Sequence, residues 1–251
     1  MGNEGEGKSS IKDYSIDGVR SKLDIMTRDI VIGLEQRARF PQNLSIYSPD
    51  AIPIKGRTGI SLFEFAIEGL EKYHASLGRF EYEDQNPVVL EAKKPEKFEP
   101  PSDFYEKYEK SLKAPSVKNV SLDIKVNQDI LSFYTNFIRL LCIPGNDKTC
   151  LGKTAYCDAN NVVTLNERIN LGKYVADAKL KDNPMILGMK GDDLIEKLRN
   201  PGREAELLKS VSTLSDKYGL NKNLADIFFK WIIDETLKVE ADYVMKKPKV
   251  V

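Results

Sequence analysis

The sequence predicts an all-α fold, a single-domain bundle of several helices. Apolar residues recur at steps of three and four along most of the chain, which is the spacing of one helix face. Alternating apolar and polar runs between hairpin turns, which would indicate strands, do not occur. The 251 residues are enough to bury a sizeable core. The polar, glycine-rich residues 1–13 are expected to form a disordered tail, and residues 14–251 the helical domain.

The first predicted helix spans about residues 15–39. Ser15 is a suitable N-cap, Asp17 suits the positively charged first turn, and Pro41 helps to end the helix. Its apolar residues form a single stripe: Ile16, Val19, Leu23, Met26, Ile30 and Leu34. Residues 41–60 hold three prolines and two glycines and are expected to form an irregular connection.

A second helix is predicted over residues 61–79, and its apolar side consists of Leu62, Phe65, Ala66, Gly69, Leu70 and Tyr73. That stripe is either core or a contact with another chain. Residues 81–120 contain five prolines and are predicted to form a loop. Loops of this length are usually functional or wrap the surface, so this segment is either a solvated connection or a recognition surface.

The second half of the chain is predicted to be almost entirely helical. The expected segments are 122–142, 160–180, 185–188, 192–198, 201–218 and 224–246. Pro144 follows the end of the first of them, and Asp192 is a plausible cap for the fourth. Gly219 suits the end of the fifth, because glycine adopts the left-handed conformation that closes many helices.

Charge and composition exclude several classes of function. Lysine plus arginine and aspartate plus glutamate both total 38, so the formal net charge is zero. Nucleic-acid-binding proteins usually show a basic excess, so the balance argues against nucleic acid but not against a small acidic substrate. No apolar run approaches the roughly 20 residues of a membrane span, so no membrane partner is expected. His74 is the single histidine, which gives little support to histidine-based metal sites.

The three cysteines, Cys142, Cys150 and Cys157, are an odd number and match no zinc-binding spacing. Free thiols in a reducing compartment are the expected state, and a Cys142–Cys150 disulfide in an exported protein is the alternative. The N-terminus lacks the apolar stretch of a signal peptide. We therefore expect a cytoplasmic protein, with secretion after removal of a signal peptide as the alternative.

Arg168 and Lys179 are the first candidates for chemistry. On one continuous helix, 100° per residue places them within about 20° of the same azimuth, three turns apart. The residues near that line are apolar or small, and buried charge without a partner is unfavourable. An intramolecular salt bridge to Asp or Glu is the ordinary explanation for such cations.

The segment from Arg168 to Lys179 also resembles a known family stretch, R-I-x-x-G-K-[FY]-V-A-[ED]-A-K, of the fungal and plant chorismate mutases of the all-helical eukaryotic type. Four other segments resemble that family in the same order: Val19–Leu23 (I-R-x-x-L), His74–Pro87 (H-x-x-x-x-R-[FY]-x-x-x-[DE]-x-x-P), Gly152–Asp158 (G-S-x-x-x-x-D) and Thr236–Tyr243 (T-x-x-x-E-x-x-Y). Together they cover roughly residues 16–246. Their order and spacing carry the resemblance.

The resemblance implies an isomerase that rearranges chorismate to prephenate with no cofactor and no metal. Seven positions keep the family's functional residue types: Arg20, Arg168, Lys179, Asn200, Glu204, Thr236 and Glu240. The implied roles are carboxylate clamps for the two arginines and, for Lys179, a cation aimed at the substrate's ether oxygen. Glu240 is implied to be the second group at that oxygen, where it must be protonated to donate. Asn200 and Glu204 are implied to hold the ring hydroxyl and a carboxylate of the substrate. Thr236 is implied to support the pocket.

The resemblance further implies a homodimer with an effector site for Tyr or Trp at the dimer interface. That site is only partly retained. Of its matching positions, Arg79 and Gly152 keep the family type, and Gly78 suits one branch of the family. The remaining positions depart from it: Thr149 and Cys150 replace asparagines, and Lys153 replaces serine. We therefore predict weak or absent control by Tyr and Trp.

Two other hypotheses remain open at this point. One is a catalytically impaired or host-acting exported relative that works as a binding or effector protein. The other is a generic helical interaction protein. The seven intact positions favour catalysis over both, because a generic interaction protein has no reason to align Arg168 and Lys179 with the distant Arg20.

Overall fold

The computed structural model describes residues 16–76, 87–89 and 127–247. In those ranges the regular elements are α-helices and short 3-10 helices, and the only β-type pairing is an isolated bridge between Ile54 and Arg57. The all-α prediction is confirmed. The predicted tail, the Ser15 cap, Gly78, Arg79 and nearly all of the 81–120 loop lie outside the described residues.

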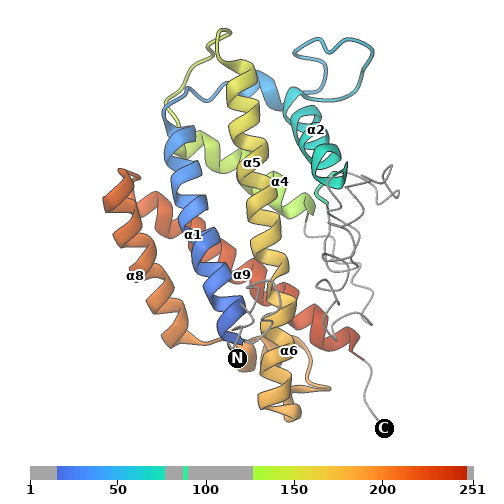
Figure 1. The fold of residues 1–251 in the computed structure, drawn as a ribbon, viewed down its shortest axis with the longest axis vertical. Coiled ribbons are helices and arrows are strands. Elements are labelled where there is room, and N and C mark those ends of the chain that lie inside the picture. Colours follow the sequence, from blue (N-terminus) through green and yellow to red (C-terminus); the bar gives the residue numbers. More distant parts are fainter. Residues whose placement is uncertain (1–15, 77–86, 90–126, 248–251) are drawn as a thin grey trace, which may run out of the picture.

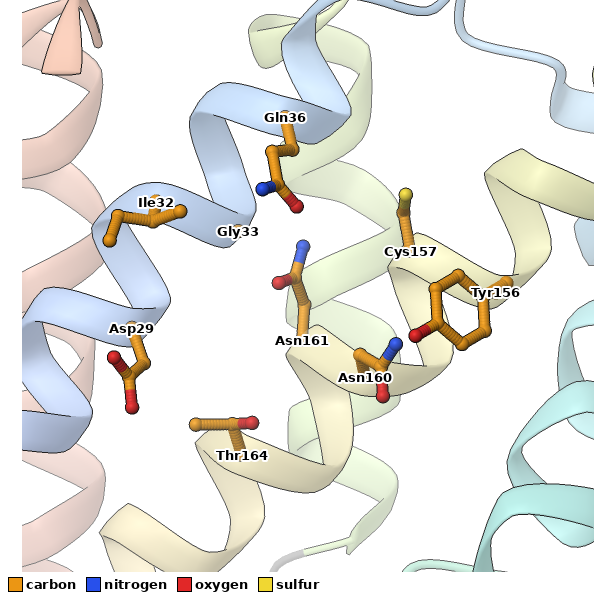
Figure 2. Close-up of a pocket in the computed structure, with 9 residues that line it drawn as sticks. All are labelled: Asp29, Ile32, Gly33, Gln36, Tyr156, Cys157, Asn160, Asn161 and Thr164. Carbon is orange, nitrogen blue, oxygen red and sulfur yellow. The ribbon is translucent and has the colours of Figure 1, made fainter.

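Two long helices, α1 (Ile16–Ala38) and α5 (Leu151–Asn170), lie side by side along the length of the molecule (Figure 1). The predicted α1 stripe is confirmed, because its members are buried or half-buried. Gly33 of α1 faces Asn161 of α5, as Figure 2 shows. A Cβ at Gly33 would lie 1.9 Å from Asn161 Oδ1, so the two helices approach this closely only with glycine at that position.

Helix α2 (Leu62–Ser76) packs on the other side of α5, and α4 (Asn127–Leu141) also contacts α5. The core side of α2 differs from the predicted stripe. The helix buries Phe63 and Ile67, whereas Phe65 is 40% and Tyr73 62% exposed. Leu62, Ala66 and Leu70 lie between these two faces and pack against the core from its margin. The physical reason is the orientation of α2 on α5, which the spacing of its apolar residues alone does not fix.

The helix predicted over residues 160–180 is two helices, so that prediction is wrong in both its start and its continuity. Helix α5 already begins at Leu151, and α6 (Gly172–Asp182) follows it after a break at Leu171. A Cβ at Gly172 would lie 3.0 Å from Thr236 Cγ2 and 3.1 Å from Thr236 O of α9. The close approach of α6 to α9 therefore depends on that glycine.

The last four elements are the 3-10 helix Pro184–Ile186, α7 (Gly191–Leu198), α8 (Pro201–Tyr218) and α9 (Lys222–Lys246). The predicted bounds of α8 are confirmed, and Gly219 ends it with φ 82°. The predicted Asp192 cap is wrong, since Lys190 is the N-cap and Asp192 lies in the first turn. Helix α9 begins two residues earlier than predicted because Asn221 caps it through bonds from the N–H groups of Asn223 and Leu224.

A buried ion pair joins α1 to α5. Arg37 Nε donates to Asp158 Oδ1 at 2.7 Å, and both side chains are fully buried. Tyr47, in the 3-10 helix Leu44–Tyr47, and Tyr134, in α4, donate to the same carboxylate at 2.7 and 2.8 Å. Arg37 also donates to backbone carbonyls that follow α1. This hydrogen-bond network joins α1, the 3-10 helix Leu44–Tyr47, α4 and α5.

Two apolar clusters make up the core. The larger joins α1, α2, α4, α5 and α9, and the smaller joins α6 and α7 to the first turns of α1 and the last turns of α9. Cys142, Cys150 and Cys157 are free thiols, so the alternative Cys142–Cys150 disulfide is not formed. None of the helices described here is both long and apolar enough to cross a membrane.

Candidate active site

A cavity of about 280 Å³ lies where α1, α6, α8 and α9 meet the end of α5. This is close to the lower size limit of ordinary ligand sites. All seven residues predicted from the sequence line it: Arg20, Arg168, Lys179, Asn200, Glu204, Thr236 and Glu240. The break at Leu171 does not separate Arg168 from Lys179, since both face the same cavity.

Arg168 is the most unusual of these residues, because its side chain is almost completely buried and no carboxylate among the described residues is bonded to it, although the charge of Asp24 acts on it from nearby. Its Nε donates to Thr27 Oγ1 at 3.3 Å, and Thr27 in turn donates to the Leu23 carbonyl. The guanidinium also lies 5.7 Å from the centre of the Phe229 ring. Burial lowers the pKa of Arg168 to about 10, so the group stays charged at neutral pH. A buried cation of this kind is suited to an anionic ligand.

Lys179 and Glu240 form a close pair across α6 and α9. Lys179 Nζ lies 2.6 Å from Glu240 Oε2 and donates to the Leu198 carbonyl at 2.5 Å. Leu198 ends α7, where the helix dipole favours a cation. An ammonium group has three donors, so one of them remains for a ligand.

Glu240 is only 4% exposed. Burial raises the pKa of Glu240 to about 7, although the charge of Lys179 opposes the shift. The carboxyl group is therefore partly protonated near neutral pH. Because Oε2 accepts the bond from Lys179, the protonated Oε1 would be able to donate to a ligand in the cavity.

The remaining predicted residues are held by local bonds. Asn200 is the N-cap of α8, where its Oδ1 accepts from the Arg203 N–H at 3.0 Å. Glu204 pairs with Arg199 at 3.0 Å. Thr236 Oγ1 donates to the carbonyl four residues earlier in α9. Arg20, in contrast, is exposed, and its ion pair within the described part of the chain is with Asp17, at 3.4 Å.

The sequence analysis missed three charged residues that line the same cavity, Asp24, Asp182 and Arg203. Arg203 Nη2 donates to Asp24 Oδ1 at 3.0 Å, which joins α8 to α1. None of the three belongs to a motif that carried the family resemblance. The available signal was position, because Arg203 lies between Asn200 and Glu204 on the first turn of α8.

The described residues of the predicted effector site lie around the start of α5. Thr149 donates through its backbone N–H and its hydroxyl to Asp147 Oδ1, and Cys150 is the N-cap of α5. Lys153 Nζ lies 5.5 Å from the centre of the Phe40 ring, and Gly152 faces open space. Among the residues the structure describes, no group of three or more His, Cys, Asp or Glu side chains could hold a metal ion.

Comparison of the sequence with known proteins gives a consistent result. The family model described as chorismate mutase type II matches residues 151–241, from the start of α5 to near the end of α9. Chorismate mutase 1 (chloroplastic) of Arabidopsis thaliana is 27% identical over 264 residues, covering 93% of this chain and 74% of that protein. The chorismate mutase of Schizosaccharomyces pombe is 26% identical over 254 residues, covering 92% and 96%.

Comparison of the structure agrees with that of the sequence. The crystal structure of a chorismate mutase from Candida albicans in complex with L-Trp superposes with a TM-score of 0.79 at 25% identity, covering 94% of each chain. The crystal structure of AtCM1 with tyrosine bound in its allosteric site gives a TM-score of 0.76 at 29% identity, covering 96% of this chain and 97% of that one.

Proposed function

We propose that this chain, which belongs to the chorismate mutases of the all-helical eukaryotic type, rearranges chorismate to prephenate in the cavity between α1, α6, α8 and α9. The family makes it an isomerase of aromatic amino-acid biosynthesis. The observation that carries the choice of site is Arg168, a buried guanidinium without a carboxylate partner among the described residues, which faces the cavity beside Lys179 and Glu240.

The reaction needs geometry and charge rather than a nucleophile or a redox group. Chorismate has two carboxylates, and its [3,3] rearrangement breaks an ether C–O bond while a C–C bond forms in the same molecule. The flexible side chain must be folded into the reactive conformer, and such positioning lowers barriers strongly. We assign this clamping to Arg20 and Arg168, since arginine binds carboxylates with two parallel bonds.

Stabilisation of the negative charge that develops on the ether oxygen is assigned to Lys179 and Glu240. The Leu198 carbonyl and Glu240 hold the ammonium group in place, so it needs no reorganisation during the reaction. The raised pKa of Glu240, about 7, keeps a proton available for donation from its second oxygen. Asn200 and Glu204 are assigned to the ring hydroxyl and a carboxylate, and the pocket wall includes Thr236.

We further propose that Tyr and Trp exert little control over this enzyme, although relatives are seen with L-Trp or tyrosine bound. The hydroxyl and N–H of Thr149 are already bonded to Asp147. An asparagine would offer a carbonyl acceptor at that position, and threonine does not. Lys153 adds a positive charge that would repel the ammonium group of an amino acid.

A homodimer in the cytoplasm is the proposed physiological form. The exposed face of α2, with Phe65 and Tyr73, supports a contact there because aromatic residues are enriched at interfaces. The three free thiols support a reducing compartment.

The test is a direct assay of chorismate consumption, followed through the loss of the substrate's ultraviolet absorbance. The unsubstituted protein should convert chorismate to prephenate. Arg168→Ala and Lys179→Ala should each lower kcat/KM by about 100- to 1,000-fold, the usual effect of removing a donor to a developing charge.

The matched control is Lys181→Ala. Lys181 is on the same helix, two residues after Lys179, but it is exposed, pairs with Asp177 and does not line the cavity. It should keep full activity. An inactive parent protein, or Arg168→Ala and Lys179→Ala variants as active as the Lys181→Ala control, would contradict the proposed function.

A further inference from the structure

The ion pair between Asp24 and Arg203 differs from the other ion pairs in the cavity. This pair joins α1 to α8 at the edge of the cavity. Both side chains are partly open to water: that of Asp24 is 60% exposed and that of Arg203 is 39% exposed. Exposed ion pairs of this kind are weak and easily exchanged. The Lys179–Glu240 pair is much less accessible, with side-chain exposures of 25% and 5%.

The backbone of Arg203 is held in place, whereas its side chain has two acid partners. Its N–H donates to the cap residue Asn200 at 3.0 Å, which holds the start of α8. Its guanidinium divides between Asp24, which lines the cavity, and Glu206, which does not, at 3.0 and 3.1 Å. A small rotation of the side chain would therefore exchange Asp24 for a ligand without moving the helix.

The charges that line the cavity make such an exchange favourable for a substrate with two carboxylates. Glu204 pairs with Arg199 and Glu240 with Lys179. Arg168 has no acid bonded to it among the residues the structure describes, although the nearby charge of Asp24 also acts on its guanidinium. A dicarboxylate in the cavity would bring a second negative charge close to Asp24. Like charges repel, and Arg203 is the cation that Asp24 holds.

We infer that Arg203 is a further substrate-binding residue, and that Asp24 is a carboxylate which occupies the Arg203 guanidinium in the empty cavity and is displaced by a substrate carboxylate. This inference rests on the proposed function. It assigns Asp24 a role in setting affinity, because substrate has to compete with it for Arg203. The two residues should therefore act on KM in opposite directions and leave kcat almost unchanged.

The experiment compares steady-state kinetics of chorismate conversion by Arg203→Gln, Asp24→Asn and the double variant. Loss of one charge-assisted bond to substrate should raise the KM of Arg203→Gln by about tenfold. Asp24→Asn frees Arg203 and removes a repelling charge, so its KM should fall by about threefold, the range of an exposed ion pair. The double variant should have a KM close to that of Arg203→Gln, because Asp24 acts mainly through Arg203, and the lost repulsion of Asp24 should lower it only slightly. Arg203→Lys should recover part of the loss.

Glu206→Gln is the matched control, since it removes the other acid partner of Arg203 at a position outside the cavity. Its KM should stay within about 1.5-fold of the parent value. The midpoint of thermal unfolding, measured for every variant, shows that each is folded.

A purely structural link between α1 and α8 predicts a different pattern. Both single variants would then raise KM, and the double variant would match either of them, because removing one partner already breaks the link. That pattern, or an Arg203→Gln variant with the KM of the parent, overturns the inference while the proposed function stands. A parent protein that does not convert chorismate overturns the proposed function itself.

Discussion

The molecule contains two buried arginines in very different surroundings. Arg37 has an ion pair with Asp158 at 2.7 Å and donates to the carbonyls of Pro41 and Gln42 at 2.9 and 2.8 Å. Arg168 is buried almost as completely, yet it makes one weak bond to a hydroxyl and has no acid partner among the described residues. Both helices that carry them belong to the same core.

The pKa values of the two side chains express this difference. Burial is the largest single effect on the pKa of Arg37 and lowers it, but Asp158, Tyr47 and Cys142 together outweigh burial and raise the pKa above its usual value. At Arg168 burial prevails, and the pKa falls to about 10. The fold therefore pairs one buried arginine directly with an acid and leaves the other without a bonded acid among the described residues. Unsatisfied buried charge is a mark of function rather than of stability.

The largest expected effect comes from replacing each arginine with methionine. Arg37→Met leaves Asp158 buried without its cation, and breaking a buried pair in this way costs about 3–5 kcal/mol of folding free energy. Arg168→Met removes a charge to which no acid of the described residues is bonded, so the free energy of unfolding should stay the same or rise. Urea unfolding measures both changes.

Activity should follow the opposite order. Arg168→Met should lose about 100- to 1,000-fold in kcat/KM, whereas Arg37→Met should keep the kcat of the parent per folded molecule. If both variants lost activity and stability in the same proportion, the contrast between the two arginines would be wrong.

The next effect concerns Glu240, which shares the cavity with Arg168 and likewise has a pKa shifted by burial. It works as a donor only while protonated. Because its pKa is raised to about 7, the rate should fall as pH rises through that value. Glu240→Gln, a permanent donor, should flatten this alkaline limb. A pH–rate profile of the variant identical to that of the parent would remove Glu240 from the mechanism.

Stability gives an independent measurement of the same shift. Between pH 4.5, the ordinary pKa of the side chain, and about 7, folded Glu240 keeps a proton that the unfolded chain has released. The contribution of Glu240 to stability is therefore lost as pH rises through this window, by about 3 kcal/mol in total. The free energy of unfolding of the parent should fall relative to Glu240→Gln between pH 5 and pH 8. Equal pH dependence would mean that Glu240 titrates normally.

Much of this organisation could be predicted from the sequence. Pro201 and Gly219 mark the ends of α8, because each residue has a conformational preference that acts locally. Five of the seven predicted residues that line the cavity lie in motifs with family spacing, and the other two, Asn200 and Glu204, were matched to the family outside those motifs. Local signals were sufficient in these cases.

The remaining features depend on contacts between distant segments. The close approach of α6 to α9 depends on Gly172 meeting Thr236 of another helix, and the sequence around Gly172 does not show which residue it meets. The Asp24–Arg203 pair joins residues 179 positions apart. The buried face of α2 is set by its orientation on α5. Such features are properties of packing, so helical spacing alone could not predict them.

A smaller effect on stability and activity is expected from a substitution at Gly172. This glycine lets α6, which carries Lys179, lie close to α9, which carries Glu240. The Cβ of Gly172→Ala would press on Thr236 and push α6 away from α9, at a cost of about 1–3 kcal/mol. The displaced helix should also weaken the contact between Lys179 and Glu240, so kcat should fall severalfold.

Gly69→Ala is the control, because that helical glycine of α2 has no other atom within 4 Å of the Cβ that alanine would add. It should stabilise the protein by about 0.5–1 kcal/mol. A fall in stability equal for both variants would contradict the role given to Gly172.

The smallest expected effect tests the region around Arg37. Asn43 follows the Arg37 network and bonds the start of α5, through Thr154 Oγ1 and the Asp147 N–H at 2.9 and 2.6 Å. A ligand shifts a protein only if it binds one of two conformations better. We expect these bonds to favour a single arrangement of the region, so saturating Tyr or Trp should change kcat/KM by less than about twofold. Replacing Thr149 and Cys150 with Asn and Lys153 with Ser restores the family's residue types. A change of kcat/KM with Tyr or Trp in this triple variant alone would assign the loss of control to those three side chains. A clear change of kcat/KM in the parent would contradict the prediction, and would show that the region around Arg37 is as adaptable as the cavity around Arg168.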